Sequence, residues 1–519
     1  MCRIVILLVF LFFPSQLLSQ ILPKEGATLN YRLVGFQVPS AIKSTGYAIE
    51  IAKGNFNNVD SFVKNIVQKV NCKGRRNIVE VPAFGKQYTW RISPDSKINN
   101  EVTSSSSFHH FSTGLLPEVD THQVRLRVTQ KAKKYQDALV FIDGNRALYD
   151  MKGNPLWYLP IIEGSATTPH DLKLSNGSIT CLVDEQIYDL DYNGSIIWKG
   201  PNTGDVSGDS IEHYNHDIIK LENGHYLTIG TENVLWNSKY PSENDSALII
   251  PNGTKNERSM ITSHFLGKDY HKLPLATLIE YDKDGKVVWS WRYSRYFKES
   301  DIYKYKKLNG MPDLMTLHNS LAINEKDGLI YLGFKAINRI IKIKYPEGNI
   351  TGTFGEQYMP NGKVKTESMF CGQHNIRINS AGQLYLFNNN CCYTDRVPEI
   401  LIFKEPASLK DTLQKVWEYK CAIDGDTKIH LDSNKRPVYN FLRGGTVLEL
   451  PDKSIFAVMS GNYSKVFIIT RDKKIVWGAV PEKWNQEKMI WEPIFQYRTN
   501  IIYNRKEFER LVWCAESAI

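Results

Sequence analysis

Four histidines occupy the same place in four similar segments of the chain. The segments begin His170-Asp-Leu, His216-Asp-Ile, His318-Asn-Ser and His374-Asn-Ile, and each continues with alternating apolar and polar residues. Only 12 histidines occur in 519 residues, so four such placements are improbable by chance. If the segments are equivalent strands of a repeated fold, we expect the four imidazoles to converge on one point.

Converging imidazoles can do three kinds of chemistry. They can bind a transition metal, act as a nucleophile or as a general acid and base, or hold an anion when protonated. Asp171 and Asp217 are available carboxylates, but each directly follows its histidine, and neighbours in a strand point to opposite faces. This disfavours a metal site. An alternative without chemistry stays open, most of all for His170: each histidine caps a turn and orients the Asp or Asn that follows it.

A second repeat indicates the elements that position these histidines. An Asp-x-x-Gly-x-x-x-Trp pattern ends at Trp157, Trp198 and Trp289, and weaker copies end at Phe354, Trp417 and Trp477. Each copy is a turn followed by a strand, which suits the outer hairpin of a propeller blade. Six units of about 40 residues or more predict a six-bladed β-propeller over residues 131–519, with a loop insertion near 236–275. The short first unit needs the segment Ile494–Tyr503 as its last strand, which closes the ring and removes exposed sheet edges.

Residues 21–130 have a different pattern. Short alternating runs such as Tyr31–Phe36, Tyr88–Ile92 and Val124–Val128 are separated by Gly, Pro, Asn and Ser. This pattern predicts a β-sandwich of fibronectin type III or immunoglobulin type, with a structural role. The strongest helix signal in the chain is Asn58–Val70. The fold class we expect is therefore all-β, an N-terminal sandwich followed by the propeller.

Composition excludes several classes of protein. Aromatic residues make up 12% and charged residues 23%, which excludes disorder as the dominant state. The net charge of 64 − 55 = +9 comes without a Lys- or Arg-rich block, so we expect no nucleic-acid partner. In residues 1–20, Arg3 precedes the apolar run Ile4–Phe13, which is typical of a signal peptide and too short for a membrane span. The mature protein is expected to be secreted or periplasmic, without a membrane span.

The motifs around the histidines resemble those of the bacterial aryl-sulfate sulfotransferase family. The segments in question are Tyr214-Asn-His216-Asp217, Leu317-His318-Asn319-Ser320 and Gly372-Gln373-His374-Asn375. The resemblance covers nearly the whole mature chain and implies transfer of a sulfuryl group from an aryl sulfate to a phenol, without a nucleotide sulfate donor. It implies that His374 is the nucleophile, carried as a sulfohistidine, that His216 is its acid/base partner, and that no metal or cofactor takes part.

The chain departs from the family pattern at three positions. When the sequences are aligned on Asn-Ser, the family histidine falls on Leu317, so His318 is displaced by one residue. The family arginine falls on Lys335, which keeps the charge but loses the bidentate fork. The usual Gln-His-Asp ends in Asn375. The resemblance thus gives His374, His216, His318 and Lys335 as catalytic residues.

Further residues near these motifs complete the expected site. Asn319, Tyr214 and Tyr393 are candidates for substrate binding, the tyrosines by stacking on a phenol ring. Cys371 could pair with Cys391 or Cys392 to brace the loop of His374. Two alternatives stay open: a non-catalytic propeller that binds a ligand or protein, and a metal-dependent propeller hydrolase or lyase. The natural donor and acceptor and the oligomeric state, including a homodimer, also stay open.

Overall fold

The protein is all-β, as predicted, with 54% of residues in strands and 5% in helices. The computed structural model describes residues 21–37, 47–72, 74–94, 107–114, 123–237, 248–249, 270–297, 316–359, 363–391, 397–406, 412–421, 430–431, 437–438, 443–460 and 464–514. The predicted signal peptide at residues 1–20 therefore lies outside the described residues. The chain forms two compact units, Met1–Leu115 and Leu116–Ile519.

The first unit contains a five-stranded and a two-stranded sheet. The larger sheet has the order β1 (Ala27–Leu29), β7 (His109–Thr113), β6 (Lys86–Pro94), β3 (Tyr47–Lys53) and β4 (Ile66–Asn71), while β2 (Leu33–Gln37) pairs with β5 (Arg76–Glu80). Its core is aromatic, with Trp90 edge-on to Phe36 at a centroid distance of 5.0 Å. The helix predicted at Asn58–Val70 is wrong in its second half, because α1 spans only Val59–Lys64. From Ile66 onward every second residue is exposed, as in an edge strand.

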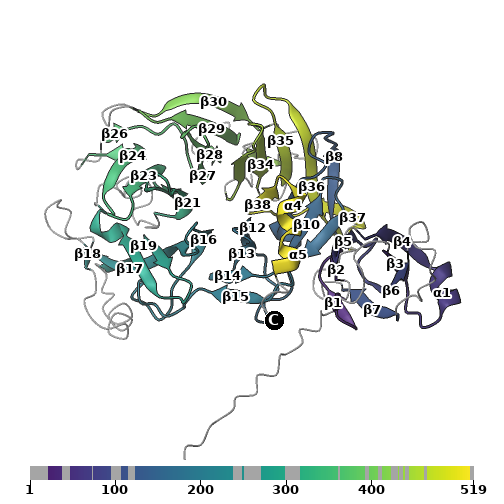
Figure 1. Ribbon diagram of the computed structural model, residues 1–519. Helices are drawn as coiled ribbons and strands as arrows, with labels where there is room; N and C mark the ends of the chain where they lie inside the picture. Colours follow the sequence, from purple (N-terminus) through teal and green to yellow (C-terminus); the bar gives the residue numbers. More distant parts are fainter. Residues whose placement is uncertain are drawn as a thin grey trace, which may run out of the picture. The chain divides into compact units, whose positions relative to one another are not determined.

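The second unit contains six larger sheets (Figure 1). We number them in chain order. Sheet 1 is β11 (Pro155–Tyr158), β10 (Ala147–Asp150), β9 (Leu139–Ile142) and β38 (Thr499–Ile502); sheet 2 is β12 (His170–Ser175), β13 (Ser178–Val183), β14 (Gln186–Leu190) and β15 (Ile196–Lys199); sheet 3 is β16 (Asn215–Lys220), β17 (Tyr226–Asn237), β19 (Tyr270–Tyr281) and β20 (Val287–Arg292), with β18 (Leu248–Ile249) on β17. Part of the predicted insertion near 236–275 separates β17 from β19.

The remaining sheets follow the same antiparallel pattern. Sheet 4 is β21 (His318–Asn324), β22 (Leu329–Phe334), β23 (Arg339–Lys344) and β24 (Ile350–Gly355); sheet 5 is β27 (His374–Ile378), β28 (Leu384–Asn388), β29 (Glu399–Lys404) and β30 (Gln414–Lys420); sheet 6 is β33 (Thr446–Glu449), β34 (Ile455–Met459), β35 (Lys465–Ile469), β36 (Ile475–Asn485) and β37 (Ile490–Pro493). Smaller elements are the pairs β25 (Gln357–Tyr358) with β26 (Val364–Thr366) and β31 (His430–Leu431) with β32 (Pro437–Val438), and the helices η1 (Asp143–Asn145), η2 (Tyr293–Arg295), α4 (Arg505–Glu509) and α5 (Leu511–Cys514).

One edge strand from each sheet takes part in a closed cycle of contacts. In order, β12, β16, β21, β27, β33 and β38 each contact the next, and β38 contacts β12. Strand β38 completes sheet 1 by antiparallel pairing with β9, so the C-terminal segment supplies the missing strand, as the sequence predicted. The histidine-bearing strands β12, β16, β21 and β27 are therefore neighbours in this cycle.

Strand β8 (Val124–Gln130) belongs to the second unit, although its alternating pattern placed it with the N-terminal strands. It pairs antiparallel with β36 along the edge of sheet 6. Arg125 and Arg127 each bond the Glu482 carboxylate, at 2.6 and 2.7 Å, while Leu126 between them is buried. The two charges and the apolar residue thus fit this edge, which β8 covers.

The structure explains the repeated Asp-x-x-Gly-x-x-x-Trp pattern. The aspartate side chain accepts hydrogen bonds from backbone N–H groups of its own turn, as in Asp150 with Lys152 and Asn154, both at 2.8 Å. The glycine adopts a left-handed conformation, with φ of 88° at Gly153. The tryptophan indole N–H then donates to a carbonyl of the next sheet: Trp157 to Tyr192, Trp289 to Pro346, Trp417 to Arg471 and Trp477 to Met151.

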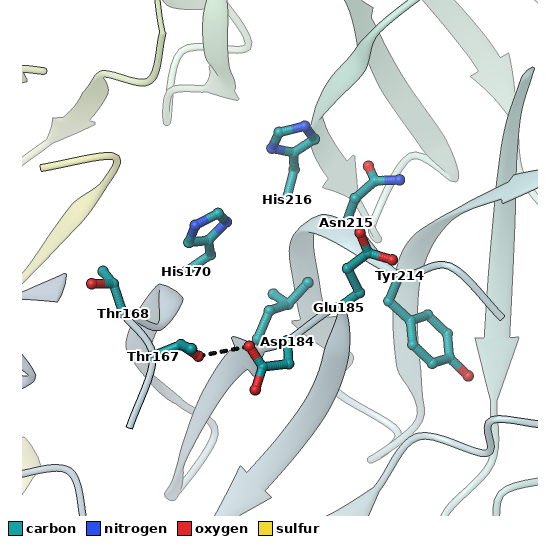
Figure 2. A pocket seen from close by; sticks show the side chains of 9 residues that line it. Thr167, Thr168, His170, Asp184, Glu185, Tyr214, Asn215 and His216 are labelled. Atoms are coloured by element: carbon teal, nitrogen blue, oxygen red, sulfur yellow. Dashed lines mark hydrogen bonds between the residues drawn. The ribbon is translucent and has the colours of Figure 1, made fainter. Parts of the chain in front are cut away.

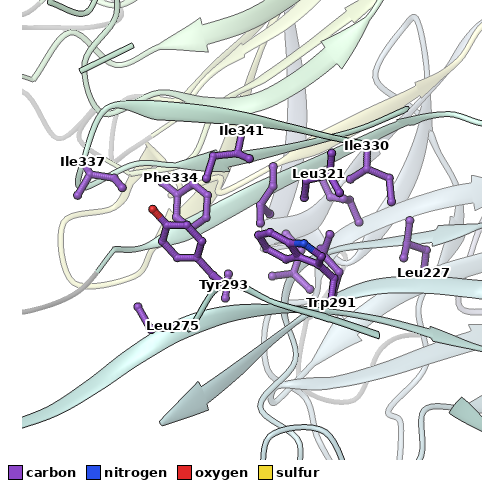
Figure 3. Packing of buried hydrophobic residues seen from close by; sticks show 14 of the residues in the cluster. Leu227, Leu275, Trp291, Tyr293, Leu321, Ile330, Phe334, Ile337 and Ile341 are labelled. Atoms are coloured by element: carbon purple, nitrogen blue, oxygen red, sulfur yellow. The ribbon is translucent and has the colours of Figure 1, made fainter. Parts of the chain in front are cut away.

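The apolar core lies between neighbouring sheets. Figure 3 shows the cluster between sheets 3 and 4, where Trp291 and Tyr293 from one sheet pack beside Phe334, Leu321 and Ile330 from the other. The Tyr293 and Phe334 rings are 4.6 Å apart between centroids. This packing leaves the starts of the edge strands to polar residues, which form the candidate site.

Candidate active site

Each histidine-bearing strand begins with a break in its β-ladder. The register shifts at the start of β12, β16, β21 and β27. The left-handed residues at these breaks are Asp171, His216, Leu317 and Asn375, with φ of 54°, 62°, 47° and 51°. In β21 this residue, Leu317, comes directly before the histidine, and the register of the strand shifts between His318 and Ser320.

The residues after these histidines point to neighbouring strands and not into a common site. Asp217 accepts a hydrogen bond from the N–H of Leu321 at 2.7 Å, Asn319 donates to the carbonyl of Gln373 at 2.8 Å, and Asn375 accepts from the N–H of Val447 at 2.9 Å. Each bond ties one edge strand to the next in the cycle. The amide of Asn319, a candidate for substrate binding, is thus engaged in holding the strands together.

His374 is buried in a hydrogen-bond arrangement that fixes its protonation. Gly444 N–H donates to His374 Nε2 at 3.1 Å, so this nitrogen carries the lone pair and Nδ1 carries the hydrogen. Nδ1 lies 2.6 Å from Asn389 Oδ1 and 3.0 Å from the Gly372 carbonyl oxygen. Burial, together with the charge of Lys335, lowers the pKa of His374 to about 3. The imidazole is therefore neutral near pH 7, with its nucleophilic nitrogen defined.

Tyr497 connects three of the four histidines. Its ring stacks on His170 and His216, at centroid distances of 4.8 and 5.5 Å, and lies edge-on to His374 at 5.9 Å. Its hydroxyl is hydrogen-bonded to His216 Nδ1 at 2.9 Å. Burial and the positive charge of Arg498 hold the pKa of His216 well below its usual value. The expected convergence of the histidines thus takes place around this phenol ring.

His318 contacts the strand that carries His216. Its Nε2 lies 2.9 Å from Thr231 Oγ1 and accepts a hydrogen bond from Asn215 Nδ2 at 3.2 Å. Burial lowers the pKa of His318 to about 4, so it too is neutral at pH 7. Because Asn215 directly precedes His216, His318 braces the turn in which His216 adopts its left-handed conformation.

A buried ion cluster stabilises the strands behind the histidines. Arg498 is fully buried, forms an ion pair with Asp217, and donates to the carbonyl of Asn319 at 2.6 Å. Arg377 lies 3.4 Å from the same Asp217 oxygen. Burial alone would raise the pKa of Asp217, but the two arginines hold it below its usual range. Sequence reasoning missed both Arg498 and Tyr497, which lie in the segment that it assigned only to ring closure.

Lys335 supplies positive charge beside His374. It directly follows β22, and its backbone N–H donates to the carbonyl of Leu317 at 2.8 Å. Burial and the nearby Arg443 lower the pKa of Lys335. Its positive charge also contributes to the lowered pKa of His374.

The loop before His374 is held by a disulfide. Cys371 is disulfide-bonded, but Cys391 is not its partner, because the sulfur of Cys391 lies 3.4 Å from that of Cys371, beyond the length of a disulfide bond. Cys392 and Tyr393, both named in the sequence analysis, lie outside the described residues. The disulfide fits the predicted brace beneath His374.

A cavity of about 420 Å³ opens beside His170 and His216 (Figure 2). Its lining comprises Thr167, Thr168, His170, Leu182, Asp184, Glu185, Tyr214, Asn215 and His216. The ring of Tyr214 points away from the two imidazoles in Figure 2, is nearly fully buried, and its hydroxyl lies 2.8 Å from that of Tyr281. This side chain therefore belongs to the core, where it offers no stacking surface.

Within the part of the chain that the structure describes, no group of three or more His, Cys, Asp or Glu is arranged to hold a metal ion. Among the same residues, no helix combines the length and apolar character needed to cross a membrane.

Comparison with known proteins identifies the family of one part of the chain. Residues 275–423 match the family described as Arylsulfotransferase (ASST). The match confirms the predicted resemblance over this segment. It includes His318, Lys335 and His374 and supports an arylsulfotransferase-like function with small-molecule substrates.

Other comparisons add little. No protein with a curated description matches the chain. A crystal structure of a protein of unknown function from Bacteroides caccae is 11% identical, with a TM-score of 0.37 over 66% of this chain and 92% of that chain. Apo AztD from Citrobacter koseri is 9% identical, with a TM-score of 0.32 over 88% and 98%. A luciferin-regenerating enzyme is 11% identical, with a TM-score of 0.32 over 72% and 95%. These TM-scores are too low to support an argument about this chain.

Proposed function

We propose that the protein is an aryl-sulfate sulfotransferase that transfers a sulfuryl group from an aryl sulfate to a phenol through N-sulfo-His374. The observation that carries the proposal is the neutral, buried imidazole of His374, whose Nε2 holds the lone pair while Nδ1–H is bound by oxygen acceptors. A buried nucleophile of fixed tautomer needs no proton removed before it attacks. The family match over the same segment supports the proposal.

In the first half-reaction, the Gly444 N–H releases the Nε2 lone pair of His374, which then attacks the sulfur of the donor. The N–S bond forms and the bond from sulfur to the aryl oxygen breaks, so that phenolate leaves with the electron pair. His374 keeps its Nδ1 hydrogen and becomes a sulfo-imidazolium, whose positive charge is stabilised by Asn389 Oδ1 and the Gly372 carbonyl. Charge spreads over the sulfuryl oxygens in such transfers, and Lys335 supplies the compensating cation.

In the second half-reaction, the oxygen of the acceptor phenol attacks the sulfur. The S–N bond breaks, its electron pair returns to Nε2, and the phenol proton passes to His216 and then to water. Burial keeps His216 neutral and able to accept this proton, while its bond to Tyr497 holds the ring in place. His318 acts through Asn215 as a positioning residue.

The proposal extends to the architecture and the location. The six sheets of the second unit and the cycle formed by their edge strands support a six-bladed propeller, and the two sheets of the first unit support a sandwich. We place the boundary between these domains before β8, since β8 pairs with sheet 6. The signal-like residues 1–20 support export to a secretory or periplasmic space.

The test is turnover of 4-nitrophenyl sulfate with phenol as acceptor, followed by nitrophenolate release. We expect acceptor-dependent release that resists a chelator and is lost in His374→Ala. His225→Ala is the matched control, because His225 pairs with Glu280 away from Tyr497. Mass spectrometry of enzyme quenched without acceptor should find the sulfuryl group on the His374 peptide.

The assay also separates the rival functions. Folded protein that releases no nitrophenolate with any of several donors and acceptors would indicate a binding propeller. Release that a chelator abolishes would indicate a metal-dependent hydrolase or lyase.

A further inference from the structure

The cavity beside His170 and His216 has a distinctive charge. Asp184 and Glu185, the two turn residues between β13 and β14, contribute its carboxylates. Asp184 accepts a hydrogen bond from Thr167 Oγ1 at 2.8 Å, which, with Ser165, keeps the pKa of this carboxyl below its usual value. Glu185 is largely exposed and lies 3.2 Å from His213 Nδ1. Both carboxylates therefore lie in the lining of the cavity, where a ligand can contact them.

Nothing in the lining balances these two negative charges. The lining residues include no lysine or arginine, and burial lowers the pKa of both imidazoles, so His170 and His216 are neutral at pH 7. Arg146 is buried, and its terminal nitrogens donate to the backbone carbonyls of Thr167 and Pro160. Its positive charge contributes to the lowered pKa of Asp184 and so offsets part of the negative charge of the two carboxylates. Arg498 is neutralised by its ion pair with Asp217. The cavity therefore presents a net negative wall.

The same cavity is also lined by imidazole nitrogens that make no hydrogen bond to the described residues. Among the described residues, His216 Nε2 and both ring nitrogens of His170 have no hydrogen-bond partner, although His216 Nδ1 is bound to Tyr497. Both imidazoles stack on Tyr497, and the edge of that ring meets His374. A ligand can thus place a polar oxygen at His216 and extend toward Asp184 and Glu185.

We infer that this cavity is the acceptor subsite and that it selects phenols carrying a cationic group, such as an ammonium on a short side chain. The inference rests on the proposed sulfotransferase function and names its acceptor class. The phenol oxygen lies at His216, attacks the sulfur of N-sulfo-His374 and gives its proton to His216, while the S–N bond breaks toward Nε2. The ammonium group is attracted by Asp184 and Glu185, whose carboxylates lie on the same wall.

The experiment compares three acceptors of similar size with 4-nitrophenyl sulfate as donor: 4-(2-aminoethyl)phenol, 4-ethylphenol and 4-hydroxyphenylacetate. We expect kcat/KM to be about tenfold higher for the amine than for the neutral phenol, and lowest for the carboxylate, with the ratio falling as salt rises. The double variant Asp184→Asn with Glu185→Gln should bring kcat/KM for the amine down to the value that the same variant has for 4-ethylphenol. The matched control, Asp472→Asn with Glu492→Gln, removes two exposed carboxylates outside the cavity and should keep the preference.

The outcomes for the inference and for the function are separable. The inference is overturned if kcat/KM is equal for the amine and 4-ethylphenol, or if the preference for the amine survives in the Asp184/Glu185 double variant. In either case, turnover of 4-ethylphenol still upholds the proposed function. If no acceptor is sulfated, the proposed function fails. Equilibrium dialysis of the same three phenols without donor then decides the inference, since binding that does not favour the amine overturns it.

Discussion

Replacing Asn389 with alanine should slow formation of the sulfo-enzyme without abolishing it. The Asn389 carbonyl accepts the Nδ1 hydrogen of His374 at 2.6 Å. While the imidazole is neutral, such a bond contributes about 1 kcal/mol, and a charge-assisted bond to the sulfo-imidazolium is roughly twice as strong. The difference, about 1 kcal/mol, is felt only as charge develops and corresponds to a roughly five- to tenfold loss of rate. The Gly372 carbonyl remains as a second acceptor at 3.0 Å, which limits the loss.

The assay is stopped-flow release of nitrophenolate in a single turnover, which isolates the first half-reaction. Asn379→Ala is the matched control, because Asn379 makes an equivalent set of bonds to Gln383 at the far end of the same hairpin. Asn389→Asp should raise the pKa of His374 and move the acid limb of the rate profile to higher pH. A wild-type rate in Asn389→Ala, or equal slowing in Asn379→Ala, would refute the assigned role, with thermal unfolding showing that each variant is folded.

Three further predictions concern stability. Burial lowers the pKa of His374 to about 3, whereas the pKa in the unfolded chain is about 6.5. Below pH 6.5 the unfolded chain therefore binds a proton at this histidine that the folded protein does not, and the free energy of unfolding falls by about 1 kcal/mol per pH unit. Urea unfolding between pH 7 and 5 should show this slope reduced in His374→Asn. Gly445→Ala should lower the free energy of unfolding by several kcal/mol in the same assay, because φ is +118° and the new Cβ would lie 2.2 Å from an aromatic ring. Gly224→Ala, at φ +85° but with open space around it, should lower it by about 1 kcal/mol. Equal losses in the two variants would contradict the packing argument. Asp217→Asn should lower the free energy of unfolding by about 3–5 kcal/mol, because it leaves the buried Arg498 without its anionic partner, whereas Glu492→Gln at the surface should change it little. A small effect at Asp217 would show that its ion pairs are not stabilising.

Repetition made much of the fold predictable from the sequence. The Asp turn and the aromatic residue recur because every sheet needs the same outer hairpin, and most of the tryptophans donate to the next sheet. The histidines recur at the starts of edge strands, so equivalence alone predicted that His170, His216 and His374 would meet. A pattern repeated several times carries its own statistical support.

Residues that occur once left no such signal. Tyr497, Arg498, Asn389 and Gly444 are brought to His374 or its neighbours by contacts distant in sequence, and no local pattern marks them. A phenol or amide in an alternating segment looks the same whether it faces solvent or an imidazole. Only the geometry of the closed cycle distinguishes them.

The errors in the helix at residues 58–70 and in the sheet assignment of β8 have a related cause. The apolar residues of 58–70 fit a helical period, and their pairing with β3 makes the second half a strand. Strand β8 was correctly expected as a strand, but alternation does not indicate which sheet a strand joins. Its partner, β36, lies far along the chain, and the arginines that match Glu482 reveal the pairing only in three dimensions.

The position of β38 sets the order in which this site can be assembled. The segment that carries Tyr497 and Arg498 joins strand β9 near the start of the same unit, and Gly144 bonds Gln496 across 352 residues of sequence. Contacts of such long range form late in folding, because loop closure must be compensated first. A nascent chain that already contains all four histidines therefore lacks the Tyr497 ring that contacts three of them and the arginine that forms an ion pair with Asp217. If the proposed function holds, His374 is inactive as a nucleophile during synthesis and export, and it becomes active only when β38 pairs with β9.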